Sequence, residues 1–311
     1  MLPTYSNSKR ALLALCLLAV VAFAGLLTSC VSVGVVLINI PASVKGGYTI
    51  QHANYGRGPA NAVDIYVPDP KNTNTRRDAV MFFYGGRWES GQISDFKFVG
   101  AALARRGYVV AIPEYRHYPA VRFPDFVEDG ARAVAWWDDH AGEFGARRGV
   151  HLAGHSAGAH IAALIAADER YLAAQGKDTR KVVRDFAGLA GPYDFTPDEK
   201  DLIDIFGPAA NYPQMQVTTF IDGREPPMLL QYGLDDKTVG AANHEKLAGR
   251  IREKGGRVKV ITYPGIGHVG MVAAISGIGP EKPVLDDMVA FFRLHEKRQL
   301  RRDHGGATLT P

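Results

Sequence analysis

Apolar and polar positions alternate along this chain in patterns that predict strands followed by helices. Short runs rich in β-branched and aromatic residues are typical of buried strands, and they span residues 79–84, 108–112, 149–154, 182–190, 227–233 and 257–263. Most of these runs are followed by a turn signal and then by a helical pattern, so we expect a mainly parallel sheet. Residues 63–68 (VDIYVP) are predicted to add an antiparallel strand at its edge.

Three longer segments have the period of amphipathic helices: 125–140, 241–256 and 283–297. In the first, one face carries Phe126, Ala133, Val134 and Trp137. Of the adjacent Trp136 and Trp137, one is expected to belong to the core. Residues 48–298 are therefore predicted to form the folded body, and residues 299–311, which lack periodicity, a disordered tail.

Composition supports one globular domain. The chain has 311 residues, of which 46% are apolar and 22% charged, and no linker of biased composition divides it. The formal charge of +4 comes from 36 basic and 32 acidic side chains. Because no basic stripe accompanies this small excess, nucleic acid is set aside as a partner.

The N-terminal segment has the features of a bacterial secretion signal. Lys9 and Arg10 precede an uncharged apolar run over residues 11–27, and LTSC follows at residues 27–30. This tetrapeptide resembles the lipobox of lipoprotein signals. Residues 1–29 are therefore predicted to be a signal peptide and Cys30 to carry a lipid, which would attach the protein to a membrane of the cell envelope on its periplasmic or outer-membrane side.

Two alternatives to the lipid anchor stay open. Residues 31–40 prolong the apolar character toward the roughly 20 residues that a membrane span needs, so the segment is also compatible with an uncleaved anchor. The other alternative is secretion without a lipid. In each case residues 30–47 are expected to be an anchor or linker, and the folded body, which has no cysteine after Cys30, can form no disulfide.

A nucleophile motif lies near the middle of the chain. Residues 154–158 read GHSAG, a G-x-S-x-G pattern, between a predicted strand and a helix of small residues. A serine on such a sharp turn has strained dihedral angles, and a side chain at Gly154 or Gly158 would collide with neighbouring backbone. Ser156 is therefore the candidate nucleophile, presented at the carboxyl edge of the sheet.

A serine hydroxyl needs an imidazole to take its proton, and the imidazole needs a carboxylate to fix its tautomer. His268 lies in a glycine-rich loop after strand 257–263, and two aspartates directly follow strand 227–233. Both loops leave the edge of the sheet that carries the serine. His268 is the predicted base, because His155 belongs to the elbow itself and His244 lies within a helix.

With these motifs, the chain from about Tyr48 to Leu294 resembles the α/β-hydrolases and is similar to bacterial carboxylesterases of the hormone-sensitive-lipase-like and feruloyl-esterase-like groups. The resemblance rests on YGGRW (84–88) for H-G-G-x-W, PEYRHYP (113–119) for a D-Y-R segment, GHSAG, and the loops GLDD and GIGH. It implies the α/β-hydrolase fold, with a mainly parallel central sheet flanked by helices. The stretch 196–226 is the only room for a lid, and it is short.

The resemblance also implies roles for individual residues. The family pattern G-x-x-D favours Asp236 as the acid, and Asp235 is expected to be a solvated neighbour. The oxyanion donors would be the main-chain N–H groups of Gly86, Arg87 and Ala157. Arg87 can replace a family glycine because the donor is backbone, and its guanidinium is a candidate for attracting an anionic acyl group.

Tyr84 stands where a histidine is usual in the family, so the loop that begins at Tyr84 is expected to be braced differently. No metal or cofactor is implied. The expected function is that of a serine carboxylesterase, and the short lid predicts a shallow site for small or slender acyl esters.

Two alternative functions are kept. The H-G-G-x-W motif also occurs in kynurenine-formamidase-like hydrolases, so amide or formamide hydrolysis is an alternative with the same chemistry. A catalytically silent binding module of the cell envelope is the other, since fold does not fix function; the complete triad argues against it. The sequence leaves the oligomeric state open.

Overall fold

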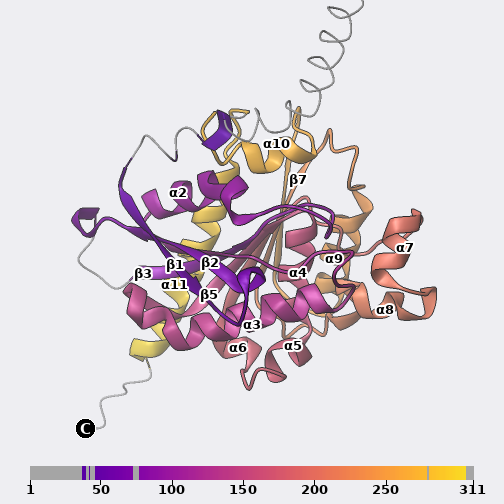
Figure 1. The fold of residues 1–311 in the computed structure, drawn as a ribbon, viewed down its shortest axis with the longest axis horizontal. Coiled ribbons are helices and arrows are strands. Elements are labelled where there is room, and N and C mark those ends of the chain that lie inside the picture. Colours follow the sequence, from indigo (N-terminus) through magenta and orange to yellow (C-terminus); the bar gives the residue numbers. More distant parts are fainter. Residues whose placement is uncertain (1–36, 40–41, 43–45, 73–76, 279, 306–311) are drawn as a thin grey trace, which may run out of the picture.

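The computed structural model describes residues 37–39, 42, 46–72, 77–278 and 280–305 (Figure 1). The predicted signal peptide, Cys30 and most of the predicted linker lie outside the described residues. Within the described ranges, no helix is both long and apolar enough to cross a membrane.

In this part of the chain, eight strands form one sheet in the order β1-β2-β4-β3-β5-β6-β7-β8. β2 pairs antiparallel with both β1 and β4, and every pair from β4 to β8 is parallel. The strands are β1 (Tyr48–Asn54), β2 (Ala62–Pro68), β3 (Arg77–Phe83), β4 (Val109–Pro113), β5 (Ala146–His155), β6 (Val183–Leu189), β7 (Met228–Gly233) and β8 (Val258–Tyr263).

The six predicted parallel strands are confirmed, and their apolar runs are explained by burial. β4 and β7, for example, are buried at every position, as expected for strands that are covered on both faces.

The predicted position of the antiparallel strand at residues 63–68 was wrong. β2 is antiparallel, but it lies between β1 and β4, and β1 forms the edge of the sheet. Most side chains of β1 are exposed. An edge strand of this kind needs no apolar run, and the sequence therefore carried little signal for it.

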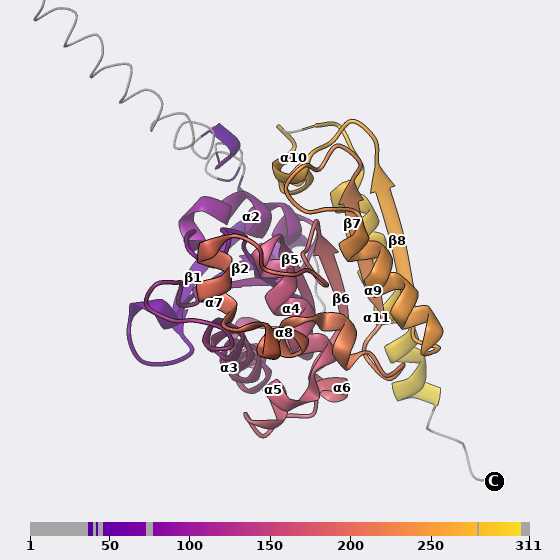
Figure 2. The same ribbon diagram turned by 90° about the vertical axis from the view of Figure 1, so that its right-hand side faces the viewer.

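Helices surround the sheet, as the turned view in Figure 2 shows. α2 packs on β2 and β4, α4 on β5 and β6, and α9 on β7 and β8. The helices are α2 (Lys97–Arg105), α3 (Asp125–His140), α4 (Ala157–Ala167), α5 (Glu169–Ala173), α6 (Thr179–Val182), α7 (Lys200–Phe206), α8 (Tyr212–Met215), α9 (Ala242–Glu253), α10 (His268–Ala273) and α11 (Val284–Gly305).

The predicted helix at residues 125–140 is α3, with the same bounds, and its predicted apolar face is buried. Trp137 has no exposed surface, whereas Trp136 is partly exposed and stacks on His140 at a centroid distance of 4.6 Å. One tryptophan of the pair is thus a core residue, as predicted.

The predicted disordered tail was wrong in part, because α11 continues to Gly305. Residues 297–302 read KRQLRR and are favourable helix formers, so they extend the helix beyond its apolar repeat. A second glycine follows Gly305 in the sequence, where a helix commonly ends. Residues 306–311 lie outside the described residues.

A buried tyrosine holds the loop that follows β3. Tyr84 has no exposed surface, and its hydroxyl donates a hydrogen bond to the Glu114 carboxylate and lies 3.3 Å from Nε2 of His117. Its ring stacks on Tyr115 and on Phe96, at centroid distances of 4.6 and 5.4 Å. The hydroxyl of Tyr115 in turn donates to the main-chain oxygen of Tyr84 at 2.8 Å. The loop therefore has a brace built around a phenol.

The carboxylate of Glu114 joins two parts of this loop. Besides the hydroxyl of Tyr84, it accepts a hydrogen bond from the main-chain N–H of Ile93 at 2.8 Å. Burial raises the pKa of Glu114, and these two hydrogen bonds act against that rise. The ionised carboxylate thus depends on both donors.

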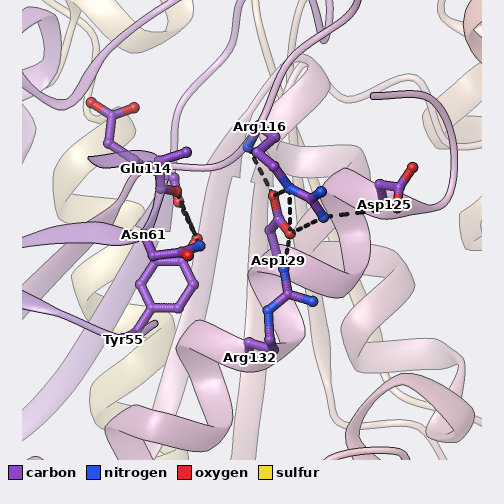
Figure 3. A network of polar contacts seen from close by, with 8 residues as sticks. Tyr55, Asn61, Glu114, Arg116, Asp125, Asp129 and Arg132 are labelled. Atoms are coloured by element: carbon purple, nitrogen blue, oxygen red, sulfur yellow. Dashed lines mark hydrogen bonds and ion pairs between the residues drawn. The ribbon is translucent and has the colours of Figure 1, made fainter. Parts of the chain in front are cut away.

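The segment that contains Glu114 is fixed from its other side by an ion pair (Figure 3). The guanidinium of Arg116 binds the fully buried carboxylate of Asp129 in α3 through Nε at 2.8 Å and Nη2 at 2.7 Å, and Arg132 donates to the same carboxylate. The hydroxyl of Tyr55 donates to the main-chain oxygen of Glu114 at 2.6 Å. With its backbone held in this way, Glu114 directs its carboxylate away from the ion pair, as Figure 3 shows.

We expect Tyr84→Phe to destabilise the protein in a pH-dependent way. The substitution removes one donor from a buried carboxylate, so the free energy of unfolding should fall by about 1–3 kcal/mol at neutral pH. The pKa of Glu114, already raised by burial, would rise further. Stability is then lost as pH rises through that pKa, and the deficit should shrink as pH falls and Glu114 takes up a proton. Urea unfolding between about pH 4 and about pH 8 measures this difference.

Tyr115→Phe is the matched control for this experiment. Its hydroxyl donates to a main-chain oxygen, which does not titrate, so the deficit should not change with pH. If the deficit of Tyr84→Phe were equally constant, the contact with Glu114 would not be the interaction that holds the loop.

Candidate active site

The GHSAG motif forms a tight turn between β5 and α4. Ser156 caps α4 with φ 54° and ψ −124°, a strained backbone conformation for a residue with a side chain. A Cβ atom at Gly158 would lie 2.1 Å from the main-chain oxygen of Phe83, and one at Gly154 would lie 2.5 Å from the oxygen of Gly158. The glycines are therefore needed for backbone contact, and Ser156 lies at the carboxyl edge of the sheet.

Three predicted residues come together at this edge. Nε2 of His268 lies 2.8 Å from Oγ of Ser156, and Nδ1 of His268 lies 2.8 Å from Oδ2 of Asp236. They come from three different loops, after β5, β7 and β8. The geometry is that of a nucleophile, a base and an acid in series.

The structure places Asp236, and not Asp235, against the histidine. The side chain of Asp236 is fully buried, and its Oδ1 accepts hydrogen bonds from the main-chain N–H groups of Thr238 at 2.8 Å and Val239 at 2.9 Å. Asp235 is exposed. The carboxylate of Asp236 thus contacts the imidazole through one oxygen and accepts hydrogen bonds from its own turn through the other. These contacts fix the orientation of the Asp236 side chain.

The loops of Asp236 and His268 pack backbone against backbone. A Cβ atom at Gly233 would lie 2.3 Å from the main-chain oxygen of Ile266, and the N–H of Asp235 donates to that same oxygen at 3.1 Å. The glycine of the G-x-x-D pattern therefore lets the two loops approach. This contact sets the position of the acid relative to the base.

His155 supports the site but does not reach the nucleophile. Its ring lies 4.8 Å from the ring of His268, and its Nε2 donates to the main-chain oxygen of His268 at 3.1 Å. Burial, together with the nearby His268, lowers the pKa of His155 to about 3. The ring therefore stays neutral and acts as a donor that holds the start of α10.

The other candidate, His244, is buried in α9 and stacks on Tyr232 at 4.3 Å. His155 and His244 thus contact neighbouring rings, and the histidine that contacts Ser156 is His268. Among the described residues, no group of three or more histidine, cysteine, aspartate or glutamate side chains could hold a metal ion.

The loop after β3 lies beside Ser156. A Cβ atom at Gly85 would meet Cβ of Ser156 at 3.1 Å, and one at Gly86 would meet the main-chain oxygen of Ser90 at 1.9 Å. Gly86, Arg87 and Trp88 all have positive φ, of 148°, 59° and 62°. The main-chain N–H groups of Gly86, Arg87 and Ala157 have no hydrogen-bond acceptor among the described residues.

The Arg87 side chain, which the sequence made a candidate for attracting an anionic acyl group, is paired with acidic side chains. Its guanidinium contacts Asp201 at 2.5 Å and Glu199 at 3.0 Å, both at the start of α7. These hydrogen bonds raise the pKa of Arg87. The positive charge of Arg87 is therefore directed toward the segment between β6 and β7. The backbone of Arg87 has a left-handed φ, so a residue other than glycine is accommodated at this position.

A cavity of about 830 Å³ opens above Ser156 and His268. Its apolar wall consists of Phe96 and Phe98, from the start of α2 and the turn before it, and Val269 and Val272 from α10. Ile38, which precedes the folded body, also lines it. Ile38 belongs to the apolar run 31–40. Because that run was interpreted as part of an anchor or linker, the sequence did not predict a place for Ile38 in the cavity.

Comparisons with known proteins agree with this architecture. The family model described as BD-FAE matches residues 63–251. The structure of esterase B from Lactobacillus rhamnosis superposes with a TM-score of 0.75 at 18% identity, over 92% of this chain and 98% of that one.

Two curated relatives cover different shares of the chain. A probable isoprenylcysteine alpha-carbonyl methylesterase of Oryza sativa subsp. japonica is 23% identical over 86% of this chain and 71% of its own length. The kynurenine formamidase of Drosophila melanogaster is 32% identical over 48% of each chain. The present chain spans 50% to 71% of the length of the plant methylesterases that it matches.

The match to the family model covers more than half of the chain, including the turn with Ser156 and the loop with Asp236. The sheet, its flanking helices and the similarity to an esterase structure agree with it. The chain therefore belongs to the BD-FAE family and is an α/β-hydrolase of the carboxylesterase type.

Proposed function

We propose that this protein is a serine carboxylesterase that hydrolyses esters with small or slender acyl groups through Ser156, His268 and Asp236. The observation that carries the proposal is the unbroken series of two 2.8 Å contacts from Ser156 through His268 to Asp236, at the base of an apolar cavity.

In the first half of the reaction, Oγ of Ser156 attacks the ester carbonyl carbon while Nε2 of His268 takes the hydroxyl proton. The carbonyl oxygen becomes negative. The free N–H groups of Gly86, Arg87 and Ala157 are its proposed donors, and each donor of this kind is worth about 3 kcal/mol of barrier. Asp236 keeps Nδ1 of His268 protonated and stabilises the imidazolium.

The intermediate then collapses, and the C–O bond to the alcohol breaks as His268 returns its proton to the leaving oxygen. The acyl group remains on Ser156. A water molecule gives a proton to Nε2 of His268 and attacks the acyl carbon. Collapse of this second intermediate releases the acid and restores the hydroxyl of Ser156.

The substrate class follows from the wall of the cavity and from the position of Arg87. Phe96, Phe98, Val269 and Val272 offer apolar contact to a hydrocarbon chain. The Arg87 guanidinium is paired with carboxylates of the 196–226 segment, so it favours no charged acyl group. Neutral esters are therefore the proposed substrates.

A second candidate function is hydrolysis of N-formyl aromatic amines. The kynurenine formamidase of Drosophila melanogaster is 32% identical to about half of this chain. The nucleophile, base and oxyanion donors would act on a formamide in the same way, with an amine as the leaving group.

The proposed place of action is the bacterial cell envelope, with a lipid on Cys30 as the anchor. The support for this proposal is the sequence alone: Lys9, Arg10, the apolar run 11–27 and the LTSC tetrapeptide.

Loss of the triad should abolish hydrolysis and labelling. Ser156→Ala should lower kcat for an aryl ester by about 10⁴-fold or more and remove labelling by a fluorophosphonate. Asp236→Asn should lower kcat by about 10³-fold to 10⁴-fold, because the imidazole loses its orienting carboxylate. Rates on a soluble aryl ester and gel-based labelling measure both effects.

Asp235→Asn is the matched control, since it removes the adjacent exposed carboxylate and should change kcat by less than about twofold. An intact protein that neither hydrolyses esters nor reacts with the fluorophosphonate would contradict the proposal and favour a silent binding module.

A substrate panel separates the two candidate reactions. Aryl esters with acyl chains of increasing length and N-formyl aromatic amines are compared by kcat/KM. We expect the esters to be preferred, with an optimum at small or slender acyl groups, because the cavity wall is apolar and the segment 196–226 leaves little room for a lid. A higher kcat/KM for the formamides would instead assign the second function, and a preference for long triglycerides would contradict the proposed acyl range.

A further inference from the structure

The N-terminal segment reaches the folded body at the mouth of the active site. Ile38 lines the catalytic cavity together with Val269 and Val272 of α10. The neighbouring Asn39 fixes this arrangement, because its side-chain oxygen accepts from the N–H of Phe98 at 2.9 Å and its side-chain nitrogen donates to the main-chain oxygen of Asp95 at 3.0 Å. In both Figure 1 and Figure 2, the short segment at residues 37–39 lies beside α10.

Exposed apolar side chains gather around this mouth. Leu37, next in the chain to Ile38, is 51% exposed, and Val269, which lines the cavity, is 70% exposed. We call Leu37, Ile38 and Val269 the apolar rim. Single exposed apolar residues are ordinary on a protein surface, but a group that continues the apolar wall of a cavity marks a contact surface.

The chain before the apolar rim limits how far the rim can be from a membrane. Cys30 precedes Leu37 by about seven residues, which span at most about 25 Å when fully extended. The apolar run 11–27 comes immediately before Cys30 and its tetrapeptide. Either a lipid on Cys30 or an uncleaved apolar anchor would therefore hold this mouth next to the bilayer.

We propose that the apolar rim rests on the surface of a lipid bilayer, so that the active site opens toward the membrane. The proposal depends on the anchor and on the serine esterase function proposed above. It narrows the substrate class to amphiphilic esters, whose hydrocarbon chain passes from the bilayer over the rim into the apolar cavity. Ser156 and His268 then meet the ester group at the base of the cavity.

Charges near the mouth indicate apolar rather than electrostatic attachment. Asp235 and Lys237 are both exposed and lie on either side of Asp236, so opposite charges occur together in this loop. A lipid surface of zwitterionic phosphatidylcholine is accordingly a suitable probe, since no excess of positive charge in this loop calls for anionic lipid.

The first experiment measures the orientation of the protein on vesicles. The full chain is isolated from membranes and reconstituted in phosphatidylcholine vesicles that contain a lipid-borne quencher. A polarity-sensitive fluorophore is attached to Val269→Cys or, as a control, to Ala174→Cys, which is exposed beside the end of α5 and far from α10 in both views. The unmodified chain, with Cys16 and Cys30, supplies the background.

The label at position 269 should shift to the blue and be quenched by the lipid, and the label at position 174 should do neither. Equal responses at the two positions, or none at position 269, would overturn the proposal. Because this readout does not need catalysis, it is independent of whether the protein is an esterase.

The second experiment compares an ester embedded in vesicles with a soluble short ester. Leu37→Asp places a charge in the apolar rim, and we expect it to lower hydrolysis of the embedded ester by about fivefold or more while hydrolysis of the soluble ester stays within about twofold. Leu294→Asp is the matched control. Leu294 is 49% exposed and does not line the cavity; it lies next to His295 and Glu296, which contact Asp185 of β6 and His151 of β5.

Leu294→Asp should leave both activities within about twofold, and an equal loss from both variants on the embedded ester would overturn the proposal. If the unmodified protein does not hydrolyse the soluble ester, that result would instead count against the esterase function. The anchor is checked separately by incorporation of labelled fatty acid, which should be lost in Cys30→Ala. If Cys30→Ala still incorporates the labelled fatty acid, the lipid is not on Cys30, and that anchor no longer supports the proposal.

Discussion

The structure depends on one close approach of backbones, at the turn between β5 and α4. Gly158 packs against the main-chain oxygen of Phe83 at the end of β3, and this contact leaves no space for a side chain. It brings the turn of Ser156 next to the loop after β3, and it holds the serine at a positive φ. A strained backbone conformation of this kind persists only where the surrounding structure holds it in place. Here the buried strands on either side do so.

The loop after β3 holds two departures from the family pattern, and the two residues contact each other. Tyr84 replaces a histidine, and Glu114 stands where the resembling segment has an aspartate. The structure joins them by a hydrogen bond. In the sequence, Tyr84 was the departure that called for a different brace, and its hydrogen bond to Glu114 supplies one.

The sequence predicted the features that depend on local pattern, and it missed those that depend on partners. Buried parallel strands carry continuous apolar runs, and the residues of the triad follow strand ends, so both could be found. β1 has mostly exposed side chains and gave no such run. Two carboxylate partners of Arg87, those of Glu199 and Asp201, in contrast lie more than one hundred residues away in the chain, and no local pattern relates them to Arg87.

The segment between β6 and β7 has a further consequence for how this architecture can diversify. It connects two strand ends, and its acidic residues reach the loop beside Ser156 through the guanidinium of Arg87. The positions of Ser156, Asp236 and His268 are set by other turns of the sheet. Insertions or deletions in residues 196–226 can therefore change the surface that contacts Arg87, on the outer side of the loop beside Ser156, while the reacting groups keep their spacing, so this segment is the part of the architecture that tolerates variation in length.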